Sequence, residues 1–171
     1  IFFFARAGWS GQKSKRINHP FIIDTDSKNL RSNRLHIGGH PEWDYGHRMI
    51  GRKKDRQILY DTENQIVIGT LGSPEIFPDP EGDIALSPNG LLFVNGHKDK
   101  KKKVNYYTIY DRESGFHIRT KGFNIGHWQS GDLRQDPSPC WNRTNDKILV
   151  PSVSKDGKTR QLFLLELKMK S

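Results

Sequence analysis

The sequence lacks most of the residues and spacings that define common catalytic and metal-binding motifs. Cys140 is the only cysteine among 171 residues, so no intramolecular disulfide can form. The chain contains no glycine-rich phosphate loop, no Gly-x-Ser-x-Gly turn, no His-Glu-x-x-His pair and no cysteine cluster. No stretch approaches the roughly 18 apolar residues that a membrane-spanning helix needs. These absences set aside a disulfide-linked scaffold, the best-known nucleotide, hydrolase and zinc motifs, and a helical membrane span.

Helical periodicity is also nearly absent. No convincing run places apolar residues at i, i+3, i+4 and i+7, whereas short β-rich runs bounded by Gly, Pro, Asn and Asp occur throughout the chain. The hydrophobic fraction of 33% and the mean hydropathy of −0.77 are low, as many short strands separated by polar turns would make them. Aromatic residues make up 11% of the chain, which argues against disorder. The pattern predicts an all-β domain.

A recurring unit organises the expected strands. Three times a buried-type residue precedes a polar turn, which is followed by a short apolar run and then by a strand with an acidic end. The turns lie at 40–46, 85–90 and 139–146, the apolar runs at 49–50, 91–94 and 148–150, and the later strands at 58–61, 107–111 and 162–166. A four-stranded unit that repeats about every 40–50 residues is typical of a β-propeller. We therefore predict a β-propeller of four-stranded antiparallel blades, with any site in the loops at one mouth of its central channel.

The repeats are incomplete. A fourth strand of the acidic-ended kind, 21–24, follows residues 1–6 without a blade head of its own, so the chain holds about three and a half blades. Closure is what removes exposed edges from a propeller. We therefore expect residues 1–171 to form a single propeller domain, the C-terminal part of a longer chain, completed by the remaining blades of the same protein.

The formal net charge of +9 predicts a polyanionic partner. Nucleic acid, an anionic membrane surface and an acidic polysaccharide all fit this charge. Nucleic acid ranks last, because the basic residues are scattered over turns and do not form a stripe along one element. The lysine-rich run 99–103 is interpreted as a solvated hairpin tip.

Two segments carry candidate chemistry. His40 follows Gly38 and Gly39, where it is either a ligand or general base at the channel mouth or a structural histidine bonded to a neighbouring strand. His19 repeats the same His-Pro pair one blade earlier, so two imidazoles could face one cavity.

The second segment is 126–137, which gathers a His, a Trp, an Arg and two Asp ahead of the last blade head. Arg134 could contact a ligand carboxylate through two hydrogen bonds, or pair with Asp132 or Asp136 and hold the loop. Trp128 could stack on a sugar ring or a base, or pack in the core.

These segments also carry a family resemblance that covers most of the chain. Residues 39–43, 133–141 and 159–164 resemble the C-terminal blades of oligogalacturonate lyase-like propellers, and 86–90 resembles the wider TolB-type, WD40-like repeat. The resemblance implies a divalent metal, manganese, with His40 as a ligand in its His-Pro-x-Trp context. The remaining ligands of that family form a Gln-x-x-His-x-His cluster, but Asp136 and Ser138 stand here where histidines would be. His127 is the candidate substitute.

The chemistry that the resemblance implies is β-elimination on a uronate-containing acidic oligo- or polysaccharide. Such a reaction needs the carboxylate neutralised by an arginine or a metal, a base such as histidine, and an acid such as tyrosine. The residues expected in these roles are His40 and His19 as base or metal ligands, Tyr107 as acid, Arg119 or Arg134 at the carboxylate, and Trp128 and Gln135 as further substrate contacts. The resemblance also implies a periplasmic or secreted protein.

A non-catalytic, TolB-like binding or scaffold propeller is the alternative. The missing Gln-x-x-His-x-His cluster favours it, since fold-level repeats specify architecture more than activity. A third interpretation is the propeller part of a longer peptidase, whose chemistry would lie in another domain.

Overall fold

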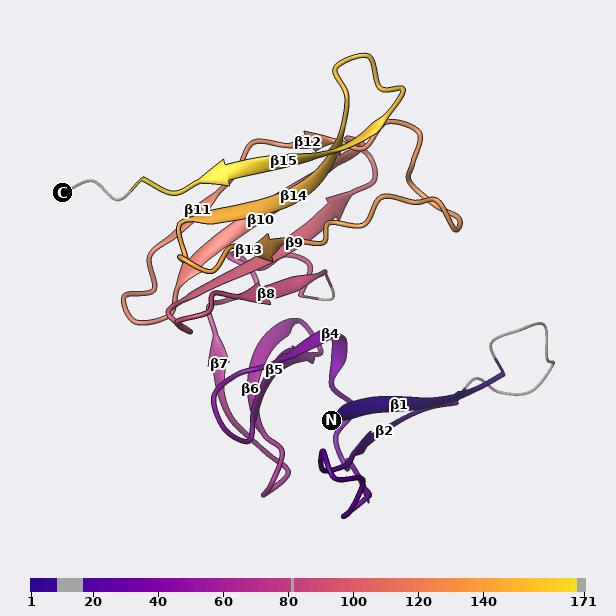
Figure 1. Ribbon diagram of the computed structural model, residues 1–171, viewed down its shortest axis with the longest axis vertical. Coiled ribbons are helices and arrows are strands. Elements are labelled where there is room, and N and C mark those ends of the chain that lie inside the picture. Colours follow the sequence, from indigo (N-terminus) through magenta and orange to yellow (C-terminus); the bar gives the residue numbers. More distant parts are fainter. Residues whose placement is uncertain (9–16, 81, 169–171) are drawn as a thin grey trace.

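The computed structural model describes residues 1–8, 17–80 and 82–168 as an all-β structure (Figure 1). Within these ranges there is no helix, and therefore none long and apolar enough to cross a membrane. The strands form four antiparallel sheets of three to five strands. The sheets follow one another in chain order, so that the N-terminal and C-terminal sheets lie at opposite ends of the molecule (Figure 1).

Each sheet is built from consecutive strands. The first sheet contains β1 (Phe2–Ala7), β2 (Ile17–Ile22) and β3 (Arg31–Ser32). The second contains β4 (Gly38–Trp43), β5 (Arg48–Lys53), β6 (Arg56–Asp61) and β7 (Ile66–Leu71). The third contains β8 (Ile84–Leu86), β9 (Leu92–Asp99), β10 (Val104–Asp111), β11 (His117–Arg119) and β12 (Phe123–Asn124). The fourth contains β13 (Cys140–Trp141), β14 (Lys147–Val153) and β15 (Arg160–Glu166).

The acidic strand ends that marked the repeat in the sequence cap the turns that follow them. Asp61 at the end of β6 and Asp111 at the end of β10 each accept hydrogen bonds from the backbone N–H groups two and three residues further on. The Asn64 side chain is the main cause that lowers the pKa of Asp61, and the Ser114 backbone is the main cause for Asp111. The repeated acid is therefore a turn-forming device, in which a short carboxylate replaces missing backbone partners.

The core consists of three apolar layers, one between each pair of successive sheets. Phe2 of the first sheet packs on Ile58 and Tyr60 of the second. Ile50 of the second sheet belongs to a cluster with Phe93 of the third. The last layer joins the third and fourth sheets, and its buried members are Ala85, Val94, Tyr107, Ile109, Ile148 and Val150. Because both faces of the middle sheets are covered there, a strand such as β9 buries successive residues, from Phe93 to His97, and not only every second one.

The expected all-β class and antiparallel strand pairing are confirmed. The second sheet has the predicted four-stranded unit in sequential order, and the predicted solvated tip at 99–103 is the turn between β9 and β10. The sheets remain open along the part of the chain that is described, and none of them closes on itself. The first strands of the second, third and fourth sheets, β4, β8 and β13, lie side by side, and a site can form where they meet.

Candidate functional site

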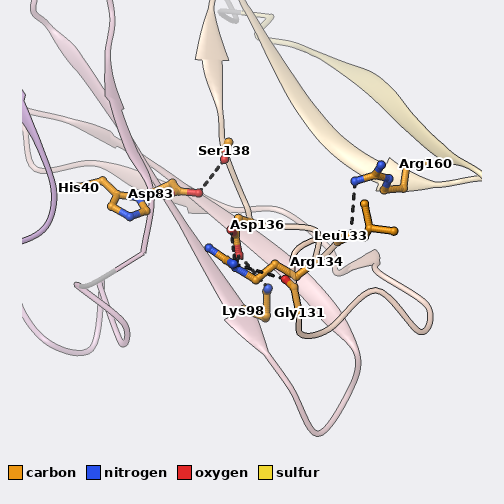
Figure 2. Close-up of polar contacts among 9 residues, drawn as sticks. All are labelled: His40, Asp83, Lys98, Gly131, Leu133, Arg134, Asp136, Ser138 and Arg160. Carbon is orange, nitrogen blue, oxygen red and sulfur yellow. Dashed lines mark hydrogen bonds and ion pairs between the residues drawn. The ribbon is translucent and has the colours of Figure 1, made fainter. Parts of the chain in front are cut away.

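A cleft of about 360 Å³ lies where the second, third and fourth sheets converge. His40 comes from β4, Asp83 directly precedes β8, and residues 129–137 form the approach to β13. The cleft is lined by His40, Asp79, Gly82, Asp83, Lys98, Lys100, Gln129, Ser130, Gly131, Arg134, Asp136 and Pro137. The two segments that the sequence singled out, around His40 and around Arg134, therefore open onto one cavity (Figure 2).

His40 is held by a buried carboxylate. Its Nδ1 contacts Asp83 Oδ1, and Ser138 Oγ donates a hydrogen bond of 2.8 Å to Asp83 Oδ2. The Asp83 side chain is 10% exposed and that of His40 is 69% exposed, so the carboxylate anchors an imidazole that projects into solvent. With Nδ1 donating to the carboxylate, Nε2 is the ring atom left to accept a proton or meet a ligand.

The backbone explains the direction of the His40 side chain. The pairing of β4 with β5 shifts register between Gly38 and Glu42, and Gly39 has a φ of 74°. A bulge of this kind bends the strand and turns a side chain out of the regular alternation. Gly39 adopts the left-handed conformation without the steric cost that a Cβ would bring.

A second ionic group forms the opposite wall. Lys98 Nζ lies 3.1 Å from Asp136 Oδ1, and Arg134 Nε lies 2.8 Å from Asp136 Oδ2. The Arg134 side chain is 52% exposed, and its Nη1 donates a 3.4 Å hydrogen bond to the Gly131 carbonyl. Arg134 thus pairs with Asp136 and holds its loop, as one of the two sequence interpretations proposed. Two cations share one carboxylate, so this wall keeps a net positive charge.

The formal charges around the cleft are balanced, but their exposure differs. The lining includes three acidic and three basic side chains besides His40. The acidic ones, Asp79, Asp83 and Asp136, are buried or half-buried, whereas Lys100 and Arg134 are exposed. The rim that a ligand meets first is therefore cationic, because the exposed charges are basic and the acidic side chains lie deeper in the cleft.

A larger groove of about 1000 Å³ lies on the other side of the Arg134–Asp136 pair. Trp128 and Gln135 both line it, as does Arg160. The Arg160 guanidinium lies 5.2 Å from the Trp128 ring centre, and the His127 ring lies 4.3 Å from it, so the indole is already in contact with two cationic or polar side chains. Gln135 is 3% exposed, and its amide has no hydrogen-bond partner among the described residues.

Four of the predicted residues, His19, Tyr107, Arg119 and His127, line neither the cleft nor the larger groove. His19 in β2 bonds Ser32 Oγ through Nε2 at 2.7 Å and belongs to the first sheet. Tyr107 is fully buried in β10, where burial raises the pKa of its hydroxyl and the O–H donates to the Pro151 carbonyl at 3.3 Å. Arg119 donates to Thr108 Oγ1 and to two carbonyl groups of the loop after β7. In these positions Tyr107 and Arg119 hold strands together.

The donor set does not fit the manganese ion that the resemblance implies. Within residues 1–8, 17–80 and 82–168 no group of three or more His, Cys, Asp or Glu side chains is close enough to hold a metal ion. The His40 ring is engaged by Asp83, and the His127 ring lies against Trp128.

Sequence reasoning missed Asp83, Lys98 and the anchoring role of Ser138. Asp83 meets His40 across 43 residues and Ser138 across 55, and Lys98 meets Asp136 across 38. No local motif encodes such contacts, because they depend on how the sheets stack. A single acid directly before a short strand, as in Gly82-Asp83-Ile84, was the one available signal.

Comparison with known proteins supports the architecture and leaves the chemistry open. No family model matches this chain, and no curated protein matches it. Among solved structures it is similar to the crystal structure of TolB from Acinetobacter baumannii, with a TM-score of 0.54 and 15% sequence identity. The match covers 97% of this chain and 41% of that one. At this identity the likeness is one of fold: it supports a TolB-type propeller architecture and does not test the oligogalacturonate lyase-like specificity.

Proposed function

We propose that this chain is a non-catalytic, TolB-like binding or scaffold module whose stacked sheets are blades of a β-propeller. The observation that carries the proposal is the convergence of three sheets on one cleft with a cationic rim. In propeller architectures the loops and inner strand ends at one mouth of the channel are where ligands meet the protein. The likeness of fold to TolB supports the architecture, and the remaining blades would come from the same protein, periplasmic or secreted as the resemblance implies.

The ligand that best fits the rim is acidic, and we propose a carboxylate-bearing oligosaccharide. Arg134 Nε bonds Asp136 and Nη1 bonds the Gly131 carbonyl, so Nη2 is the guanidinium nitrogen outside these two bonds, from which a charge-assisted hydrogen bond can be donated to a ligand carboxylate. His40 adds a donor or acceptor on the opposite wall, fixed in place by Asp83. The net charge of +9 strengthens the attraction, which falls as salt rises.

Titration calorimetry with oligogalacturonate and with an uncharged oligosaccharide of equal length tests this proposal. We expect heat of binding from the acidic ligand alone, and a drop in affinity of roughly tenfold for Arg134→Gln, equivalent to the loss of one charge-assisted hydrogen bond. Arg143→Gln is the matched control, because Arg143 is an exposed arginine outside the cleft. Equal affinity of the two variants would show that the charge acts from elsewhere.

A uronate lyase is the second candidate, and one observation favours it. An exposed imidazole held by a buried carboxylate is the arrangement of a general base. His40 Nε2 would take the proton from the carbon next to the substrate carboxylate. The C=C bond would form as the C–O bond to the leaving sugar breaks, and the leaving oxygen would take a proton from water. Incubation with polygalacturonate, alginate and ulvan, followed by the ultraviolet absorbance of unsaturated product, tests it. Absence of product from all three would exclude this candidate while leaving binding intact.

A further inference from the structure

Three β-hairpins in successive sheets turn at the same end of the molecule. Polar contacts join the inner strands, or the residues just before them, at His40–Asp83, Glu42–Leu86, Ser138–Asp83 and Trp141–Ala85. Residue numbers rise together along both pairs of strands, so β4, β8 and β13 run in the same direction. Each is followed by an antiparallel strand. The hairpins β5–β6, β9–β10 and β14–β15 therefore all turn beside the starts of the inner strands, where the cleft lies.

The tips of these hairpins are basic. They comprise residues 53–56, 99–103 and 154–160, which together hold ten basic and three acidic residues, a net charge of +7 against +9 for the whole chain. All ten basic residues are exposed. The hairpins that turn at the other end, 61–66 and 111–117, hold four acidic residues and one arginine. The positive charge that is scattered over turns in the sequence is therefore gathered at one end of the fold. We call the three segments the basic tips.

The cleft lies between two of the basic tips. Lys98 and Lys100, at the β9–β10 tip, line the same cleft as Arg134. The Leu133 carbonyl, next to Arg134, accepts a 3.4 Å hydrogen bond from Arg160 Nη1 at the β14–β15 tip (Figure 2). A series of cations thus leads from one tip, through the cleft, to the next tip.

The composition of the basic tips indicates which polyanion they fit. They contain no aromatic residue on which a nucleic-acid base could stack and no apolar side chain that could enter a bilayer. Their lysines are point charges, which attract an anion without selecting its shape. Shape selection comes from the cleft, where Arg134 Nη2 can donate to a carboxylate. A flat membrane would touch the tips and leave the cleft unused, whereas a linear acidic chain can occupy both.

We propose that this end of the protein binds a linear acidic polysaccharide that is longer than the cleft. One uronate lies at Arg134, and the units on either side of it cross the β9–β10 and β14–β15 tips. The β5–β6 tip adds to the positive field that draws the chain in. The inference rests on the proposed function for the carboxylate site in the cleft, and it adds the tips and a dependence on chain length. Each further ion pair releases counterions from the polymer, so affinity for the polymer should fall more steeply with salt than affinity for a short ligand.

Titration calorimetry with trigalacturonate and with long polygalacturonate, at equal uronate concentration, tests the inference. We expect the polymer to bind roughly tenfold more tightly than the trimer. The variant Lys101→Gln/Lys155→Gln/Lys158→Gln neutralises three tip lysines that do not line the cleft. It should remove this roughly tenfold gain, because the exposed ion pairs that produce it are lost. The same variant should change the affinity for the trimer by less than about twofold, because the cleft is intact and the lost charges are screened from it.

A matched control removes the same charge from elsewhere. The variant Lys28→Gln/Arg143→Gln/Lys147→Gln changes three basic residues outside both the basic tips and the cleft. It should keep the affinity for the polymer within about twofold of the wild type, since these charges are distant from the bound chain. Circular dichroism of both triple variants checks that they are folded.

The outcomes separate this inference from the proposed function. Equal affinity for polymer and trimer, or equal losses in the two triple variants, would overturn the inference and leave the carboxylate site standing. Absence of binding to both ligands would overturn the proposed function and the inference with it. Duplex DNA and phosphatidylglycerol vesicles are the competing polyanions. If either bound as tightly as polygalacturonate, with the same loss in the tip variant, a polysaccharide would be the wrong occupant.

Discussion

The ion pair between Asp44 and Arg112 ties the second sheet to the third, and its removal is the sharpest test of how the sheets are held together. Arg112 Nη1 and Nη2 lie 3.0 and 2.9 Å from the two carboxylate oxygens of Asp44, and Nη1 also donates to the Gly90 carbonyl at 2.6 Å. The Arg112 side chain is 15% exposed and that of Asp44 is 3% exposed. Arg112→Ala would leave the buried carboxylate with Arg48, at 3.5 Å, and a hydrogen bond from the Tyr45 backbone.

The expected cost follows from that burial. Removing one partner of a buried ion pair costs about 3–5 kcal/mol, and we expect the lower end, about 3 kcal/mol, because Arg48 remains. With a slope of about 2 kcal/mol per M, the urea midpoint should fall by roughly 1.5 M. Arg48→Ala is the control, since that side chain is 42% exposed and should cost about 0.5 kcal/mol or less.

The pH dependence gives a second reading of the same pair. Burial is the largest influence on the pKa of Asp44 and raises it, but the hydrogen bond and charge of Arg112, together with the Tyr45 backbone and the charge of Arg48, lower the pKa overall. A lowered pKa means that the pair stabilises the fold above the ordinary aspartate value of about 3.9 and that this contribution is lost as the pH falls through the folded value. The difference in urea midpoint between wild type and Arg112→Ala should therefore shrink below about pH 4. A loss under 1 kcal/mol at pH 7, or a difference that does not shrink in acid, would refute the reasoning.

Three further changes test the packing around the cleft. Gly96→Ala should lower the free energy of unfolding in urea by about 1–3 kcal/mol, because the added Cβ would collide with the Pro137 carbonyl. Gly69→Ala is the control and should be near neutral, since the nearest atom to its added Cβ would be 3.6 Å away. Asp83→Ala should lower the free energy of unfolding by about 1–3 kcal/mol in the same measurement, since it removes the carboxylate that both His40 and Ser138 bond. Burial raises the pKa of Tyr107 and so favours its neutral form in the folded state. The contribution of this residue to stability is therefore present below the ordinary tyrosine pKa of about 10 and is lost as the pH rises above it. Tyr107→Phe should flatten the fall in unfolding free energy at alkaline pH, and an unchanged slope would contradict this.

The parts of the fold that were predictable are those encoded locally. An acid at the end of a β-rich run caps the next turn through backbone N–H groups two and three residues further on. The turns after Asp61 and Asp111 could therefore be predicted from the sequence. The lysine-rich tip between β9 and β10 was equally local. Strand pairing between neighbours in the chain follows from such turns, which is why the antiparallel pairing matched expectation. The number of strands did not match throughout, because among the described residues the third sheet has five strands and the fourth has three where four were predicted.

The site was predictable only in outline. His40 and Arg134 stood out through unusual neighbours, and both line the cleft. The role of Tyr107 could not be predicted from the sequence. Strand β10 buries the successive residues Tyr107, Thr108 and Ile109, so alternation along the strand cannot distinguish a core side chain from one that reaches a cavity. The contact between Asp83 and His40 could not be predicted, because the two residues lie 43 positions apart in the sequence and meet only in the folded structure.

The most direct test of the central claim is where an acidic ligand protects the backbone. Hydrogen–deuterium exchange of the chain with and without oligogalacturonate would locate it. We predict slower exchange in β4 around His40 and in residues 129–137, with no change in β7, and loss of this protection in Arg134→Gln. Binding that leaves both cleft segments unprotected, or protects only segments outside them, would contradict the account.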